Sequence, residues 1–316
     1  MQFRILGSPE LYDERRHRRI PLTSPKQRLL LGTLLARPNS PVPRERLIRE
    51  LWGALPPRKA RNTLNAHVSG LRKVLLEVEP ERANTPRIVA RAAGYLLEAR
   101  PAETDSGRFC LAVAQARRMA QDDPRGAYDS LRRALGLWRG TALEGGSHGP
   151  VCAALVAQLE EERQQALEIL FDCALRTGEH RGIIPELEEL TVAHPLRERF
   201  HDQLMLALCR CGRGADAIRV YTRARQRLTA AHGGTPLLTA RLEQISVQAP
   251  SLFAHEAERP EARKRARVMA PAAGGREIDR LRQEMNQIEA EQQTARSVVG
   301  YLTNILSGQA LRTGGA

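Results

Sequence analysis

One helical stretch, residues 59–77, narrows the possible folds of the N-terminal third more than any other feature. Its main apolar residues form a single stripe, because they are spaced 4, 3 and 4 residues apart. They are Leu64, Val68, Leu71 and Leu75. Two shorter helical stretches precede it, and two β-like runs around Ala92-Ala93-Gly94 follow it. Three helices followed by a hairpin predict a winged helix-turn-helix.

The first hundred residues supply the rest of such a domain. Short strands are expected at residues 2–6, 10–12 and 20–22. Ser24 is expected to cap the first helix, with Pro25 at its first position. The second helix is expected to run from Pro43 to Gly53. We therefore predict a winged-helix domain of α+β class over residues 1–100, in a chain that is otherwise mainly α.

Positive charge is concentrated in this N-terminal region. The chain carries a formal net charge of +13, and residues 1–100 hold 20 Lys and Arg against 9 Asp and Glu. The remaining residues hold 29 against 27. A basic region joined to a nearly neutral remainder indicates a nucleic-acid partner. Charge alone would also suit an acidic protein or a membrane surface, so these alternatives stay open here.

The third helix presents a polar face opposite its apolar stripe. Small residues in the middle of such a face let a helix approach base edges, while amide and cationic side chains beside them can bind bases or phosphates. The candidate DNA-binding residues on this helix are Asn62, Thr63, Asn65, His67, Ser69, Arg72 and Lys73. An ordinary solvated face, which would also be polar, is the alternative. We favour double-stranded DNA as the partner because a basic hairpin follows the same helix.

Three further candidates lie outside this helix. Arg87 and Arg91 fall in the predicted hairpin, where a wing enters the minor groove or contacts a phosphate. Trp52 ends the second helix. Its indole N–H could donate to a phosphate, and packing in the core is an equally good interpretation.

From residue 105 to about 249 the sequence pattern is helical throughout. Two breaks in it, Thr177-Gly178 and Cys211-Gly212, lie 34 residues apart, which is the tetratricopeptide period. Apolar residues repeat at the same offset, for example Ile184 with Ile218. We expect a tetratricopeptide-like all-helical domain over residues 101–250, with a plain helical bundle as the alternative.

The last part of the chain divides into two segments. Residues 251–276 contain prolines, glycines and a basic cluster and are expected to form a linker. Residues 277–308 are expected to form a C-terminal helix whose apolar positions alternate at spacings of 3 and 4. Such a seam predicts a coiled coil that joins protomers into a homodimer or a higher oligomer. The alternative is a single amphipathic helix packed on the repeat domain.

Motifs for several kinds of chemistry are missing from the sequence. It contains no Gly-x-x-x-x-Gly-Lys-Ser/Thr loop and no His-Glu-x-x-His. Its five cysteines suit neither a disulfide framework nor a zinc site, and no apolar run approaches the roughly 20 residues of a membrane span. We therefore expect a cytoplasmic, nucleoid-associated protein that is not an enzyme and has no cofactor, metal or membrane partner.

Several ordered motifs resemble one known family. In the N-terminal part they are Lys26-Gln27-Arg28-Leu29-Leu30-Leu31, Leu47-Ile48-Arg49-Glu50-Leu51-Trp52-Gly53, Ala60-Arg61-Asn62-Thr63-Leu64-Asn65, Val68-Ser69-Gly70-Leu71-Arg72 and Gly94-Tyr95. In the helical part they include Ala134-Leu135-Gly136-Leu137-Trp138-Arg139-Gly140 and His194-Pro195-Leu196-Arg197-Glu198-Arg199. Over residues 1–250 the chain resembles the Streptomyces antibiotic regulatory proteins, which join an OmpR-type winged helix to a bacterial transcriptional activation domain.

This resemblance implies a transcriptional activator of a biosynthetic gene cluster in an actinobacterium. Such a protein would bind direct repeats near the −35 element of promoter DNA and recruit RNA polymerase holoenzyme. By position, the resemblance places Asn62, Thr63, His67, Ser69, Arg72 and Lys73 on the recognition helix and Arg91 at the wing. Gly70 departs from the family, which usually has Arg there. A repressor with the same DNA-binding domain, and a tetratricopeptide scaffold whose basic head docks a protein, are the alternative functions.

Overall fold

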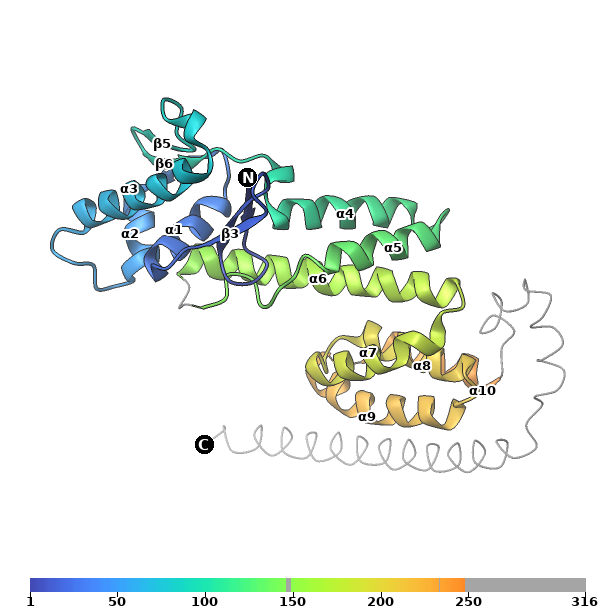
Figure 1. Cartoon of the computed structure of the whole chain (residues 1–316). Coiled ribbons are helices and arrows are strands. Elements are labelled where there is room, and N and C mark those ends of the chain that lie inside the picture. The colour runs from blue at the N-terminus through green and yellow to red at the C-terminus, as the bar shows by residue number, and fades with distance from the viewer. Residues whose placement is uncertain (146–148, 233, 248–316) are drawn as a thin grey trace, which may run out of the picture. The chain divides into compact units, whose positions relative to one another are not determined.

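The computed structural model describes residues 1–145, 149–232 and 234–247. The linker predicted at residues 251–276 and the helix predicted at residues 277–308 lie outside the described residues. The chain folds into two compact units, Met1–Thr177 and a second that begins at Gly178 (Figure 1).

A three-stranded antiparallel sheet opens the first unit. Its order is β1-β2-β3, and its strands are β1 (Gln2–Arg4), β2 (Glu10–Asp13) and β3 (Arg18–Pro21). Phe3 and Leu11 are paired across the first two strands and are fully buried, because alternate side chains of a strand share one face. The Asp13 carboxylate accepts hydrogen bonds from the backbone N–H groups of Arg15 and Arg16. These bonds hold the basic turn between β2 and β3.

Three helices follow the sheet. They are α1 (Pro25–Leu35), α2 (Arg44–Trp52) and α3 (Ala60–Val78). The Ser24 side chain accepts a hydrogen bond from the Gln27 N–H, so the predicted cap is confirmed. Leu64 and Leu71 of the α3 stripe are fully buried, and α3 packs on α1 and α2. The predicted third helix is therefore confirmed to within a residue at each end.

A second sheet supplies the wing. Its order is β4-β6-β5, and its strands are β4 (Val42–Pro43), β5 (Ile88–Arg91) and β6 (Gly94–Leu97). Gly94 is not among the residues with positive φ, so its backbone conformation alone does not require glycine. A Cβ at this position would lie 1.9 Å from the carbonyl oxygen of Val42. Glycine is required because β4 and β6 approach closely, and the predicted winged helix-turn-helix is confirmed.

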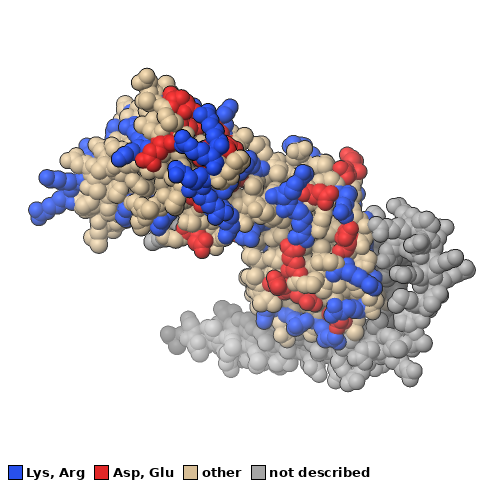
Figure 2. Space-filling model, in the orientation of Figure 1, with Lys and Arg blue, Asp and Glu red and all other residues tan. Residues whose placement is uncertain are grey.

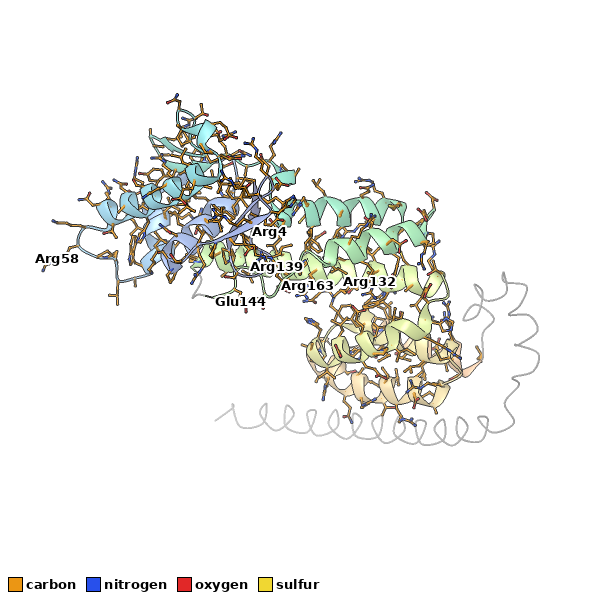
Figure 3. The ribbon with its side chains drawn as sticks, viewed as in Figure 1. Arg4, Arg58, Arg132, Arg139, Glu144 and Arg163 are labelled. Carbon is orange, nitrogen blue, oxygen red and sulfur yellow. The ribbon has the colours of Figure 1, made fainter. Side chains whose placement is uncertain are left out.

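Three long helices complete the first unit: α4 (Asp105–Met119), α5 (Pro124–Leu135) and α6 (Pro150–Arg176). The Asp105 carboxylate is buried and accepts hydrogen bonds from the N–H groups of Ile5 and Leu6 at 2.9–3.0 Å. Arg139 donates its backbone N–H to the Leu6 carbonyl at 2.8 Å, and its guanidinium lies 3.4 Å from Asp105. Figure 3 shows Arg139 beside the N-terminal sheet. Burial raises the pKa of Asp105 above its ordinary value.

A second buried carboxylate joins α2 to α6. Glu50 is 4% exposed and accepts hydrogen bonds from the N–H groups of Val151 and Cys152, at 2.7 and 3.4 Å. These N–H groups lie in the first turn of α6, where a helix leaves its donors without internal partners. The winged helix and α4–α6 thus share buried contacts. The winged helix predicted over residues 1–100 therefore forms one compact unit with α4–α6, Met1–Thr177.

The described part of the second unit, up to residue 247, consists of two helix pairs. They are α7 (His180–Ala193) with α8 (Glu198–Arg210), and α9 (Gly214–His232) with α10 (Pro236–Ser246). The matched residues Ile184 and Ile218 are both buried, at 7% and 6% exposed. Each helix packs on its neighbour in the chain, and α8 also contacts α10. The predicted tetratricopeptide-like helical fold is therefore confirmed. No helix in the described ranges is long and apolar enough to cross a membrane.

Candidate DNA-binding interface

α3 exposes a continuous strip of polar and small side chains opposite its buried stripe. The strip consists of Asn62, Ala66, Ser69 and Lys73, all exposed. With 19 residues, α3 is about 28 Å long, and a major groove is about 12 Å wide. The helix is therefore long enough to lie across the groove with its small residues near the base edges.

The hairpin is fixed against one side of this strip by two of the predicted site residues. The Tyr95 hydroxyl donates to the Asn65 side-chain oxygen at 2.8 Å. Arg72 donates from two guanidinium nitrogens to the Ile88 carbonyl at 2.9 and 2.8 Å. Asn65 is exposed, whereas Arg72 is half-buried. Arg72 thus uses two of its guanidinium nitrogens to hold the wing in place, although the sequence predicted a DNA contact for this residue.

The other side of the strip rests on the end of α2. The Trp52 and His67 rings are 6.0 Å apart between centroids, and both side chains are half-buried. The Lys26 ammonium lies 5.8 Å from the Trp52 ring. Burial, together with the charge of Lys26, lowers the pKa of His67 below its ordinary value. The half-buried Thr63 donates its hydroxyl to the Lys59 carbonyl at 3.1 Å.

Arg87 does not lie where the sequence analysis put it. Its side chain is 6% exposed and donates to Glu79 at 2.8 Å and to Glu103 at 3.0 Å, with a further bond to the Glu98 carbonyl. Burial alone raises the pKa of Glu103, but hydrogen bonds from Arg87 and Arg100 outweigh it and lower this pKa to about 2. The prediction that Arg87 contacts DNA is therefore wrong, because its donors are taken up inside the fold.

Arg91 is exposed at the end of β5, in the hairpin. It is paired with Gly94, so its side chain leaves the sheet on the face opposite that of the neighbouring Tyr95. On that face it lines a shallow pocket of about 570 Å³ with Arg82, Arg100 and Glu98 among its other lining residues. Arg91 is thus accessible, but it is separated from the α3 strip by the thickness of the hairpin.

A basic cluster before α3 was missed by the sequence analysis. Arg58 and Lys59 are exposed in the α2–α3 loop, and Arg61 in the first turn of α3 pairs with Glu45 at 3.0 Å between two exposed side chains. Figure 3 shows Arg58 extending from this loop, and Figure 2 shows basic side chains gathered at its tip. The run Arg58-Lys59-Ala60-Arg61, which leads into the first turn of the recognition helix, was the available signal, since cations there can reach phosphates.

Within residues 1–145, 149–232 and 234–247, no group of three His, Cys, Asp or Glu side chains is arranged to hold a metal ion. The sequence does contain one Gly-x-Ser-x-Gly pattern, at residues 145–149. A nucleophile elbow needs a strand before this pattern. Here the preceding residues form a turn, and Ser147 lies outside the described residues.

The architecture matches two known sequence families. Residues 17–97 match "Transcriptional regulatory protein, C terminal", and residues 104–244 match "Bacterial transcriptional activator domain". Together with the winged helix, these matches define the chain as a transcriptional regulator.

Individual relatives narrow this class to a family. The chain is 34% identical to regulatory protein DnrI from Streptomyces peucetius, over 70% of this chain and 82% of DnrI. It is 40% identical to transcriptional regulator RedD from Streptomyces coelicolor, over 72% of this chain and 65% of RedD, so it spans slightly less than two thirds of that relative. The structure of Mycobacterium tuberculosis EmbR in complex with a low-affinity phosphopeptide is similar, with a TM-score of 0.73 at 30% identity, over 87% of this chain and 72% of that one. The chain belongs to the Streptomyces antibiotic regulatory protein family of DNA-binding transcriptional activators.

Proposed function

We propose that this protein is a sequence-specific activator of a biosynthetic gene cluster, with α3 in the major groove of promoter DNA. The observation that carries the proposal is the exposed strip of α3, bordered by the hairpin on one side and by α2 on the other. Asn62 and Ser69 would face base edges, and Lys73 would face a phosphate. The target is a direct repeat near the −35 element, and activation follows from recruitment of RNA polymerase holoenzyme.

The remaining candidates take different parts in this interface. Asn65 faces DNA while it accepts the Tyr95 hydrogen bond. His67 and Trp52 set the position of α3 against α2, and Arg72 sets it against the wing. Thr63 stabilises the first turn of α3. Arg91 contacts a phosphate beside the minor groove. Arg58 and Lys59 bind the DNA phosphate backbone where α3 enters the groove. The protein acts at the nucleoid, in the cytoplasm.

A footprint combined with reconstituted transcription tests this function. The full chain should protect two spaced repeats and raise transcription from the adjacent promoter. Asn62→Ala should lose about 1–3 kcal/mol of discrimination at one base pair, while its thermal unfolding stays as in wild type because Asn62 is exposed. Protection with reduced transcription would identify a repressor. Retention on all duplexes alike, with strong binding to an acidic protein, would identify a scaffold.

Self-association through residues 277–308 forms a second part of the proposal. Two linked winged helices bind tandem repeats with higher avidity than one. Deletion of residues 277–316 should lower the molar mass measured by light scattering and weaken binding to the paired repeats, but not to a single repeat. An unchanged mass and affinity would assign the segment to packing within one protomer.

A further inference from the structure

The first turn of α1 lies directly against the middle of α3, at Gly70. A Cβ at position 70 would lie 2.5 Å from the side-chain nitrogen of Gln27. Any other residue at position 70 would therefore displace the Gln27 side chain. The neighbouring Lys26 fixes the same turn, because its ammonium donates to the Leu51 carbonyl at the end of α2 and lies over the Trp52 ring.

Gly70 borders the exposed strip of α3. On a helix, residues three and four apart are neighbours, so Gly70 lies beside Ala66 and Lys73, two members of the strip. Position 70 itself supplies no side chain there. The half-buried Gln27 occupies the space that a side chain at position 70 would take. A carboxamide from α1 therefore lies beside the strip.

The Gln27 carboxamide is chemically suited to DNA. It carries two N–H donors and a carbonyl acceptor. The backbone N–H of Gln27 donates to the Ser24 cap. Its side chain forms no hydrogen bond with another residue of the described part of the chain. A carboxamide can pair with adenine in the major groove or donate to a phosphate oxygen.

We infer that Gln27 is a DNA-contacting residue, which reaches the acceptor groups of DNA from α1 because position 70 is glycine. This inference rests on the proposed function, since it requires α3 to lie in the major groove. In either case the Gln27 carboxamide donates a hydrogen bond to an oxygen or nitrogen acceptor of the duplex. The two sources of that acceptor, a phosphate and a base edge, are separated by the experiment.

The test compares four variants of the full chain on the footprinted operator: Gln27→Ala, Gly70→Ala, their combination and Gly182→Ala. Gln27→Ala should weaken binding about 3- to 10-fold, the amount expected for one hydrogen bond between neutral groups. Gly70→Ala should weaken it similarly by displacing Gln27, and the double variant should bind no more weakly than the weaker single variant. Gly182→Ala is the matched control, because a Cβ at this helical glycine of α7 meets nothing within 4 Å.

Binding to a panel of single-base variants then identifies the contact. If Gln27→Ala loses discrimination at one base pair only, the contact is with a base edge. If it loses the same affinity on every sequence, the contact is with a phosphate. Both results support the inference. Wild-type affinity of Gln27→Ala, or additive losses in the double variant, would overturn it. Thermal unfolding of each variant shows whether a weakened affinity arises from unfolding. If wild type itself prefers no sequence, the proposed function fails, which is a result distinct from failure of the Gln27 contact.

Discussion

Arg87 and Arg91 are four residues apart on one hairpin, yet they belong to different populations of charge. Arg87 is buried against Glu79 and Glu103, and Arg91 is exposed at the end of the wing. The same contrast separates Glu50, which caps α6 from inside the fold, from Glu45, which pairs with Arg61 at the surface. The net positive charge of residues 1–100 therefore combines two populations of charged side chains, buried and exposed. One population joins the parts of the first unit, and the other lies at the surface, where its cations are accessible.

The largest effect on stability should come from a truncation that removes the partners of the buried charges. A fragment that ends at Arg100 loses Asp105, and with it the acceptor of the Ile5 and Leu6 N–H groups. It also leaves Glu50 without its partners on α6. We expect the fragment 1–177 to unfold cooperatively on heating, followed by circular dichroism, and the fragment 1–100 to show no cooperative transition. Equal melting curves would show that the winged helix is independent of α4–α6.

The second largest effect should follow removal of one buried cation. Arg87→Met leaves the half-buried Glu79 and Glu103 without their common partner, although Arg82 and Arg100 still pair with them, and should cost roughly 1–3 kcal/mol of unfolding free energy. The matched Arg91→Met should change stability by less than about 0.5 kcal/mol and instead weaken DNA binding. Urea unfolding and operator titration of both variants make the comparison. The contrast between the two arginines fails if both variants lose stability to the same extent.

The unfolding free energy should depend on pH through the same network of Arg87 and Glu103. The pKa of Glu103 is lowered from an ordinary 4.5 to about 2 in the folded state, so the folded state favours the ionised carboxylate. Its contribution to stability is complete above pH about 4.5 and is lost as the pH falls towards about 2. Arg87→Met should flatten the stability profile across this window. A variant profile parallel to that of wild type would argue against Arg87 as the source of the lowered pKa.

The smallest effect should come from the exposed population. Lys73→Ala removes one cation from the α3 strip, so the slope of log affinity against log salt should become shallower by about 1. Its unfolding free energy should remain within about 0.5 kcal/mol of wild type. Titrations at several salt concentrations measure the slope, with Lys59→Ala as a second exposed lysine for comparison. An unchanged slope would remove Lys73 from the phosphate contacts.

Local patterns predicted the elements of the fold well, because periodicity and caps act over a few residues. The stripe on α3 and the Ser24 cap are examples. The roles of single charges were less predictable, because their partners are distant in sequence. Arg87 meets Glu103 across 16 residues, and Asp105 meets Ile5 across 100. The spacing that places Arg87 on a hairpin carries no information about these partners, so a buried ion pair was taken for a wing contact.

The length of α6 has a mechanical consequence. Its 27 residues extend about 40 Å, and Glu50 of α2 holds its first turn. The first turn of α6 is thus fixed to the helix-turn-helix, and the rest of α6 extends away from that contact. A 5° tilt at the fastened end displaces the far end by about 3.5 Å, given that length. If the proposed DNA contact rotates α2, we therefore expect the displacement to reach the far end of α6, some 40 Å away.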